Sequence, residues 1–313
     1  DAQFAEHKHG WLSKSSSIPA MAKLKAIGRR SCWSLAGLIV ALVAAQAFVN
    51  AGHQGLPGSR SATRPAARAA TALAADAQFA EVQAAAAAAG TAAARREVRL
   101  RLLAAAASTC RGQCGSDTDR EGALQLVRAM EALNPTAQPT QKGGLLEGTW
   151  RLIYASEDVT RSSPFFWGWR KMLKGIPDPS PLSRAAFGTE ELSESIFAFT
   201  DSIPLKTVGE ATQTIYNGQM VNRVAVEVWG LGATMMTTTC RYMPADDPAE
   251  LMVTIETTQA IDNTLPLADQ VVFPSESFLG DNARIRIRIT YLDEDLRIFR
   301  NELDDQVFVY VRA

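Results

Sequence analysis

Alternating apolar and polar residues dominate the chain after Gly143, and this alternation predicts β-strands. The clearest case is the stretch RIRIRITY, in which three isoleucines and then Tyr291 take every second position and arginines take the positions between. A period of two places one set of side chains on each face of a strand. Comparable runs begin at Gly148 and continue over 195–200, 206–216, 223–228, 233–243, 250–260, 294–300 and 306–312. Eight or nine strands linked without helices predict a mainly β fold, an antiparallel barrel or sandwich with its polar faces turned to water.

Two stretches before the strands have helical character. Residues 76–109 are rich in alanine and carry arginines, which favours a helix, although alanine buries little surface and the helix would be peripheral. Between Thr118 and Leu133 apolar residues recur at helical spacing, and Asn134-Pro135 ends the pattern. We therefore expect an N-terminal helical region over 76–142 and a β-barrel domain over 143–313.

The first 75 residues have the composition of a targeting leader. Basic residues after Met21, an apolar run over 35–49 and a small-x-small sequence at 45–47 follow the order of a signal peptide. The run is shorter than the roughly 20 residues of a bilayer-spanning helix, so a retained membrane anchor is the alternative. An acid-free stretch rich in Arg, Ser and Ala comes next and is typical of a transit peptide.

These observations divide the leader into an upstream segment over 1–20, a signal peptide over 21–47 and a transit peptide over 48–75. A signal peptide followed by a transit peptide, with Phe at the junction, resembles the bipartite leader of algae with complex plastids. The leader therefore predicts a plastid protein.

Charge and histidine content exclude several kinds of function. Residues 1–75 hold nine Lys or Arg and two acids, a net charge of +7, which leaves −8 on the rest of a chain whose total is −1. An acidic mature part argues against a nucleic acid partner, since phosphate binding needs clustered cations. All three histidines lie at or before His53. Without the leader the chain would have no histidine base or ligand.

No sequence motif points to catalysis or to a metal. There is no phosphate-binding loop, nucleophile elbow or dinucleotide fingerprint, and the carboxylates are scattered. Cys110 and Cys114 lack CxxC spacing and histidine partners, so a zinc site is not indicated, whereas a redox-sensitive local disulfide stays open. Cys240 has the surroundings of a small core residue. We therefore predict a protein that is not an enzyme.

A Gly-x-Trp sequence, Gly148-Thr149-Trp150, opens the first strand and resembles the start of lipocalin barrels. Further segments follow in order: RAMEALNPTAQPTQKGGLLEGTWRLIYASE, SPFFW, FAFTDSIP, VGEATQTI and TYLDEDLRIFRNELDDQVFVYVR. Together they resemble the plastid lipid-associated protein family, also called fibrillins, from about Leu102 to Arg312. The family's last-strand pattern Leu-Arg-Ile-Ser-Arg-Gly is altered, because Phe299 and Asn301 replace Ser and Gly.

The resemblance implies a lipocalin-like barrel that associates with plastid lipids, at plastoglobules or thylakoids. It also implies that the barrel binds or shields a hydrophobic molecule, such as a carotenoid, a prenylquinone or another lipid. The partners so implied are membrane lipids or the plastoglobule surface.

Trp150 and Arg300 are predicted to form a structural plug. Trp150 faces inward on the first strand, and Arg300 shares a face with Leu296 and Ile298 on a late strand. First and last strands adjoin in a closed barrel, so the guanidinium could stack on the indole with roughly 0.5–2 kcal/mol.

The segment SPFFWGWRKMLKG over 163–175 crowds aromatic residues beside three cations. Such a mixture suits a bilayer interface or the lip of a hydrophobic pocket. A helix that simply closes one end of the barrel is an equal alternative.

Polar side chains in MMTTTCRY and at Gln213-Thr214 could fix the head group of a ligand if they point inward. Exposed strand threonines are the simpler interpretation. The side chains predicted to line a pocket or its lid are Trp150, Leu152, Tyr154, Phe165, Phe166, Trp167, Trp169, Gln213, Ile287 and Tyr291.

Two functions remain open. The first is a lipid-binding protein whose barrel holds or shields a hydrophobic molecule. The alternative is a structural thylakoid subunit that docks to a photosynthetic membrane complex and has no mobile ligand. An open apolar pocket of several hundred Å³ would favour the first, and a barrel filled with side chains would favour the second.

Overall fold

The computed structural model describes residues 91–313 except 142–143, 202–205, 229–231 and 265–271. The chain divides into two units, Asp1–Gly52 and His53–Ala313, and every described residue belongs to the second. The predicted upstream segment, signal peptide, transit peptide and first part of the alanine-rich helix lie outside the described residues. Among those described, no helix has the length and apolar character needed to span a bilayer.

Two helices precede the strands. α4 (Thr91–Ser108) buries Val98, Leu102 and Ala106, which recur every four residues and so form one stripe. α5 (Asp117–Ala132) begins at a capping box, in which the Ser116 side chain accepts a hydrogen bond from the Asp119 amide and the Asp119 carboxylate accepts one from the Ser116 amide. The predicted helix over 118–133 is confirmed with its ends shifted by one residue.

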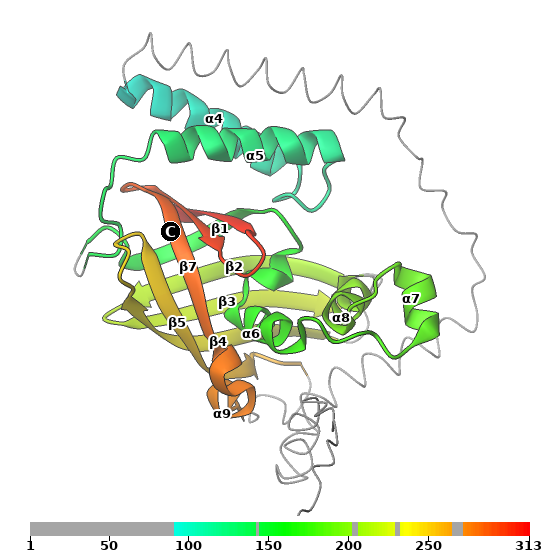
Figure 1. The fold of residues 1–313 in the computed structure, drawn as a ribbon. Coiled ribbons are helices and arrows are strands. Elements are labelled where there is room, and N and C mark those ends of the chain that lie inside the picture. The colour runs from blue at the N-terminus through cyan, green and yellow to red at the C-terminus, as the bar shows by residue number, and fades with distance from the viewer. Residues whose placement is uncertain (1–90, 142–143, 202–205, 229–231, 265–271) are drawn as a thin grey trace, which may run out of the picture. The chain divides into compact units, whose positions relative to one another are not determined.

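A closed antiparallel barrel forms the centre of the unit (Figure 1). The ring runs β1–β2–β3–β4–β5–β7–β8–β9 and back to β1, and β6 pairs with β5 outside it. The strands are β1 (Gly148–Ala155), β2 (Lys206–Tyr216), β3 (Gln219–Val228), β4 (Gly232–Pro244), β5 (Glu250–Ile261), β6 (Val272–Phe273), β7 (Arg284–Leu292), β8 (Leu296–Asn301) and β9 (Val307–Arg312). The predicted lipocalin-like barrel preceded by helices is confirmed.

Helices also lie between strands, and here the sequence prediction is wrong. Between β1 and β2 the chain forms the 3-10 turn η1 (Val159–Ser162), then α6 (Pro164–Leu173), α7 (Pro181–Phe187) and α8 (Leu192–Asp201). Between β6 and β7 it forms α9 (Ser275–Leu279) and the 3-10 turn η3 (Gly280–Ala283). The predicted strand over 195–200 is part of α8. Its Phe197 packs against Phe166 and lies under the guanidinium groups of Arg161 and Arg170, so helix contacts replace strand pairing.

Two β-bulges change the face of the strand residues that follow them. The register between β1 and β9 shifts between Leu152 and Tyr154, and that between β7 and β8 shifts between Ile289 and Tyr291. An extra residue reverses the in–out alternation beyond it. Tyr154 and Tyr291 therefore leave the barrel interior and pack against the buried stripes of α4 and α5. Their predicted place in the barrel pocket is wrong for this reason.

The unit consequently has two apolar cores. One fills the barrel and includes Trp150, Leu152, Ile287 and Phe299. The other lies between α4, α5 and the outer faces of β7, β8 and β9. Strands β8 and β9 are buried on both faces, which explains why β9 is apolar without a break from Val307 to Val311.

Candidate functional site

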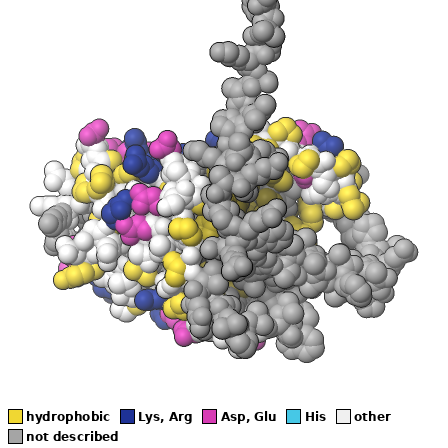
Figure 2. All heavy atoms as spheres, turned by 90° about the horizontal axis from the view of Figure 1, so that it is seen from below, with side chains coloured by type: hydrophobic (Ala, Val, Ile, Leu, Met, Phe, Trp, Pro, Cys, Tyr) yellow, Lys and Arg dark blue, Asp and Glu magenta, His cyan; other side chains and the backbone are white. Residues whose placement is uncertain are grey.

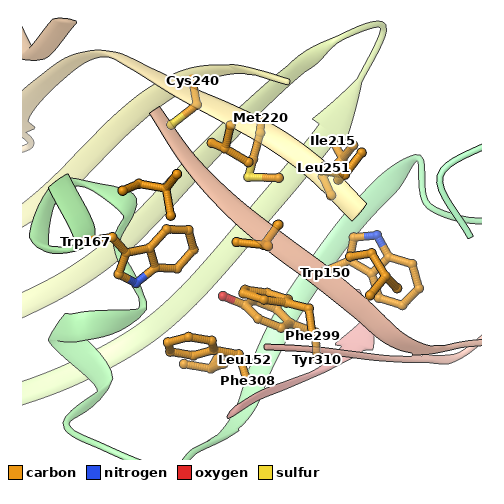
Figure 3. Packing of buried hydrophobic residues seen from close by; sticks show 14 of the residues in the cluster. Trp150, Leu152, Trp167, Ile215, Met220, Cys240, Leu251, Phe299, Phe308 and Tyr310 are labelled. Carbon is orange, nitrogen blue, oxygen red and sulfur yellow. The ribbon is translucent and has the colours of Figure 1, made fainter. Parts of the chain in front are cut away.

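The barrel interior is occupied by the protein's own side chains (Figure 3). Phe299, Phe308 and Tyr310 form a stack, with ring centroids 5.0 Å apart for Phe299–Phe308 and 5.7 Å apart for Phe299–Tyr310. Trp150 lies at one end of this stack and Trp167 at the other. All five rings are at most 2% exposed. The described interior is therefore a packed core in the region of this stack.

Trp150 closes the first end of the barrel. Its indole Nε1 donates a hydrogen bond of 2.9 Å to the Leu146 carbonyl. The guanidinium groups of Arg312 and Arg297 lie 4.3 and 5.0 Å from the ring centroid. Gly148 has a φ of 135°, which other residues rarely adopt, and a Cβ atom there would lie 2.4 Å from the Arg312 guanidinium, so glycine suits the point where Arg312 crosses β1. This crossing explains why Gly and Trp stand together at the start of the strand.

The prediction that Arg300 stacks on Trp150 is wrong. Arg300 lies on the helix-facing side of β8, where it donates hydrogen bonds of 2.8 and 3.0 Å to Glu131 of α5 and one of 2.8 Å to Asp305. Arg297, three residues earlier, lies on the opposite face and enters the barrel. Because β8 is largely buried on both faces and carries an arginine on each, the alternation alone did not show which arginine points inward.

Arg297 is a fully buried cation that the sequence analysis missed. Its Nη2 donates a hydrogen bond of 2.5 Å to Gln213 Oε1, and Gln213 Nε2 donates one of 3.3 Å to Asn222 Oδ1. Gln213 thus points inward, as expected. Burial lowers the pKa of Arg297 to about 9. Within the described part of the chain its Nε and Nη1 have no hydrogen-bond partner, and the rings of Trp150, Phe299 and Tyr310 surround it.

The aromatic segment forms α6 and closes the second end. Trp167 inserts into the barrel core, and its Nε1 donates a hydrogen bond of 2.7 Å to the Arg161 carbonyl. Phe165 is buried against Phe273, while Phe166 and Trp169 are half-buried. A Cβ on Gly168 would lie 2.6 Å from Leu279 of α9, so α6 is pressed tightly against its neighbours. This packing supports the barrel-closing interpretation and leaves no continuous exposed aromatic patch on α6.

A row of buried hydroxyl groups attaches α6 and α9 to the barrel wall. Ser163 contacts Thr238 at 2.9 Å, Thr238 contacts Thr258 at 3.3 Å, and Thr258 contacts Ser275 at 3.1 Å. Thr238 belongs to the polar run MMTTTCRY, so one of its threonines does point inward. Its partners are the protein's own Ser163, which precedes α6, and Thr258 of β5.

An ionic cluster seals the same end. Arg170 pairs with Glu157, Glu194 and Asp304, and Arg161 pairs with Glu157 and Asp201. Burial raises the pKa of Asp201 and of Asp304, against the attraction of their arginine partners. The cluster ties α6 and α8 to the loops that flank β1 and β9.

One surface element, α7, buries none of its residues. Leu182 is 80% exposed and Ile176, just before the helix, is 38% exposed. Lys174 and Arg184 are exposed beside them. Figure 2 keeps the left–right order of Figure 1 and shows hydrophobic side chains gathered at the right-hand end, where α7 lies.

A cleft of about 440 Å³ lies between α4 and the outer face of β1 and β2. Leu103, Ala106 and Ile153 give it an apolar lining, and Arg111, Arg151 and Glu210 carry charge at its edge. Over the described ranges there is no group of three or more His, Cys, Asp or Glu that could hold a metal ion. Whether the ten predicted pocket residues touch a ligand stays a prediction.

Known proteins resemble the chain in sequence. Residues 96–166 match the PAP_fibrillin family model. A plastid-lipid-associated protein, chloroplastic, of Citrus unshiu is 28% identical over 225 residues, which are 65% of this chain and 64% of that protein. A plastid lipid-associated protein 1, chloroplastic, of Brassica campestris is 26% identical over 221 residues, which are 65% of this chain and 63% of that protein. A light-induced protein, chloroplastic, of Solanum tuberosum is 24% identical over 221 residues, which are also 65% of this chain and 63% of that protein.

The chain therefore spans somewhat less than two thirds of the length of the curated relatives it matches. No solved structure significantly matches it. The names of these three proteins describe lipid association or induction by light in the chloroplast and do not describe a reaction. The predicted plastid location agrees with these names.

Proposed function

Because residues 96–166 match the PAP_fibrillin family model, we propose that this chain is a member of the plastid lipid-associated protein (fibrillin) family and a non-enzymatic structural protein of plastid lipid surfaces, at thylakoids or plastoglobules. The filled barrel is the observation that carries this proposal. Trp150, Trp167 and the aromatic stack between them occupy the interior, so lipid contact takes place on the outside of the barrel. The barrel then acts as a rigid scaffold that presents surface elements.

α7 and the residues before it are the surface element best suited to lipid. Leu182 and Ile176 expose aliphatic side chains, and burying one such side chain contributes about 1.5–3 kcal/mol. Lys174 and Arg184 lie close by in sequence and would each add on the order of 1 kcal/mol at an anionic surface. The same apolar and basic surface would serve for docking to a thylakoid protein complex.

Liposome flotation tests this proposal. Vesicles that contain an anionic lipid are mixed with the full chain or with a variant that carries Ile176→Ser and Leu182→Ser. We expect the variant to bind at least about tenfold more weakly, because two aliphatic contacts are lost. Tyr216→Ser is the matched control, since Tyr216 is 70% exposed on a different element. Equal flotation of all three proteins would rule out α7 as the lipid contact.

A second candidate function, capture of a single carotenoid, prenylquinone or other lipid, is favoured by the cleft between α4 and the barrel. Its volume of about 440 Å³ lies in the range of small-molecule sites, and its apolar lining with charged edges suits an amphipathic lipid. Ala107→Trp would fill the cleft from an exposed position of α4. Ala104→Trp, on a neighbouring face of the same helix, is the control.

Mass spectrometry of lipids that co-purify with each variant decides this second proposal. Loss of one defined lipid species from Ala107→Trp alone would support it. The absence of any lipid at stoichiometric amounts in the parent protein would contradict it and leave surface association as the function.

A further inference from the structure

The connection between α4 and α5 contains two exposed cysteines. Cys110 and Cys114 stand four residues apart, and both are solvent accessible with free thiols. A side-chain hydrogen bond with Cys110 raises the pKa of Cys114. Cys240, by contrast, is buried in the barrel, and burial raises the pKa of its thiol. Among the described cysteines, the 110–114 pair is thus the one that reagents and partner proteins can reach.

Backbone geometry keeps the two cysteines together. Cys110, Arg111 and Gly112 adopt consecutive φ values of 49°, 65° and 87°, in the left-handed region. This turn folds the chain back on itself, and the Cys114 amide donates a hydrogen bond of 2.9 Å to the Thr109 carbonyl. Non-glycine residues rarely adopt these angles, so the loop holds its shape only because its neighbours hold it. A covalent link between its two ends would hold the same shape.

The loop between the cysteines is also a clamp on the barrel. Arg111 donates hydrogen bonds of 2.6 Å to the Gly209 carbonyl and 2.5 Å to the Val208 carbonyl, at the bulge of β2. The Ala155 amide at the end of β1 donates one of 3.1 Å to the Arg111 carbonyl. A Cβ at Gly112 would collide with the Ala155 carbonyl, which shows how closely the loop and β1 approach. The loop therefore fastens the helical layer to two barrel strands.

We propose that Cys110 and Cys114 are a dithiol–disulfide couple that exchanges with an exposed dithiol–disulfide pair of a partner oxidoreductase and thereby sets the rigidity of this clamp. On oxidation, one thiolate attacks the partner's disulfide, and a mixed disulfide forms while one partner thiolate leaves. The second cysteine then attacks the mixed disulfide, which closes the bond between Cys110 and Cys114 and releases the second partner thiolate. Two electrons pass to the partner's sulfur atoms, and the two protons from Cys110 and Cys114 are released to them. Reduction reverses both steps.

The first experiment asks whether the bond forms within one chain. The full chain carries Cys32→Ser and Cys240→Ser, so that 110 and 114 hold its only thiols. It is equilibrated in dithiol–disulfide buffers of graded potential, alkylated and weighed by mass spectrometry. We expect a monomer that passes from two alkylated thiols to none, with one two-electron midpoint and a slope of about 30 mV per tenfold change in the redox ratio. Adding Cys110→Ser should abolish this transition. Only intermolecular dimers, or adducts on single cysteines, would overturn the proposal.

The second experiment asks whether the bond stiffens the clamp. Amide hydrogen exchange is compared in the oxidised and reduced forms of that protein. The Ala155 amide, which bonds to the loop, should exchange at least fivefold more slowly when the disulfide is present. The Tyr242 amide of β4 bonds to the Gly218 carbonyl in the β2–β3 turn, at the end of β2 away from the loop; its exchange should not change, and it is the control. Equal exchange at Ala155 in both forms would overturn the clamp. Neither readout depends on lipid, so a failure here is distinct from a failure of the proposed function.

Discussion

The two ends of the barrel are closed by opposite means. At the first end Trp150 belongs to a strand and lies between two arginines, Arg297 and Arg312, which face aromatic rings and backbone carbonyls. At the second end Trp167 arrives on an inserted helix, and Arg170 is surrounded by three carboxylates. One closure therefore depends on packing and cation–π contacts, and the other on an ionic cluster. Below pH 7 the first should be insensitive to pH, because its arginines stay charged there, whereas the second should respond to pH through its carboxylates.

The largest expected effect comes from removing the strand-borne plug. Trp150→Ala leaves a cavity between two guanidinium groups and deletes a fully buried indole, so the free energy of unfolding should fall by about 3–5 kcal/mol. Urea unfolding followed by far-ultraviolet circular dichroism measures it. Tyr216→Ala, at an exposed position, should change stability by no more than about 0.5 kcal/mol. Equal losses in the two variants would contradict the plug.

A smaller effect is expected at the ionic end. Arg170→Ala removes the cation that three carboxylates share, and the unpaired acids should reduce the free energy of unfolding by about 2–3 kcal/mol, below the value for a fully buried pair because the carboxylates are partly exposed. Lys174→Ala, also on α6's C-terminal side but exposed, should have almost no effect. The same urea experiment compares them. A loss as small as that of the lysine variant would mean that the cluster is not needed for closure.

The smallest effect concerns pH. Burial raises the pKa of Asp304 above its ordinary value of 3.8, so between 3.8 and the raised value the native protein binds more protons at this group than the unfolded chain does. Its contribution to stability therefore falls as pH rises through that window, and it returns as pH falls. Asp304→Asn should remove this dependence. The free energy of unfolding is measured for parent and variant between pH 3 and pH 7. The difference between the two proteins should change as pH passes through the window. A difference that stays constant over the whole range would contradict the assignment.

Sequence patterns predicted the strands well where only one face of a strand is buried. In β7 the arginines alternate with Ile285, Ile287 and Ile289, so both the strand and its inward face could be assigned correctly. The same reasoning failed at Tyr291, because a bulge inserts one residue and leaves no mark in the alternation. It failed at Arg300 because β8 is covered on both faces, so its inward face cannot be read from polarity.

The inserted helices show a different limit. Residues 195–200 alternate in polarity as a strand would, yet they form part of α8 because Phe197 finds its partners on α6 and η1. Those contacts join residues distant in sequence, and local propensity cannot anticipate them. Arg297 was missed for a related reason, since only the closed ring brings β8 to face Gln213 of β2, whereas Asn222 lies directly opposite Gln213 in the β2–β3 pairing. A glycine two residues before a tryptophan was the available signal that a side chain from another strand crosses there.

The pairing of β1 with β9, which closes the barrel, can form only after the last strand has been synthesised. Trp150 lies opposite Arg312 in this pairing, so the edge of β1 that does not pair with β2 stays uncovered until β9 is added. Contacts that join such distant residues form slowly, since the intervening chain must be ordered first. A nascent or translocating chain would hold β1 with one unpaired edge from the synthesis of β1 until that of β9, exposed to strand addition by other chains. Chaperone contact in this period would be most valuable on the face of Trp150, the residue that Arg312 finally covers.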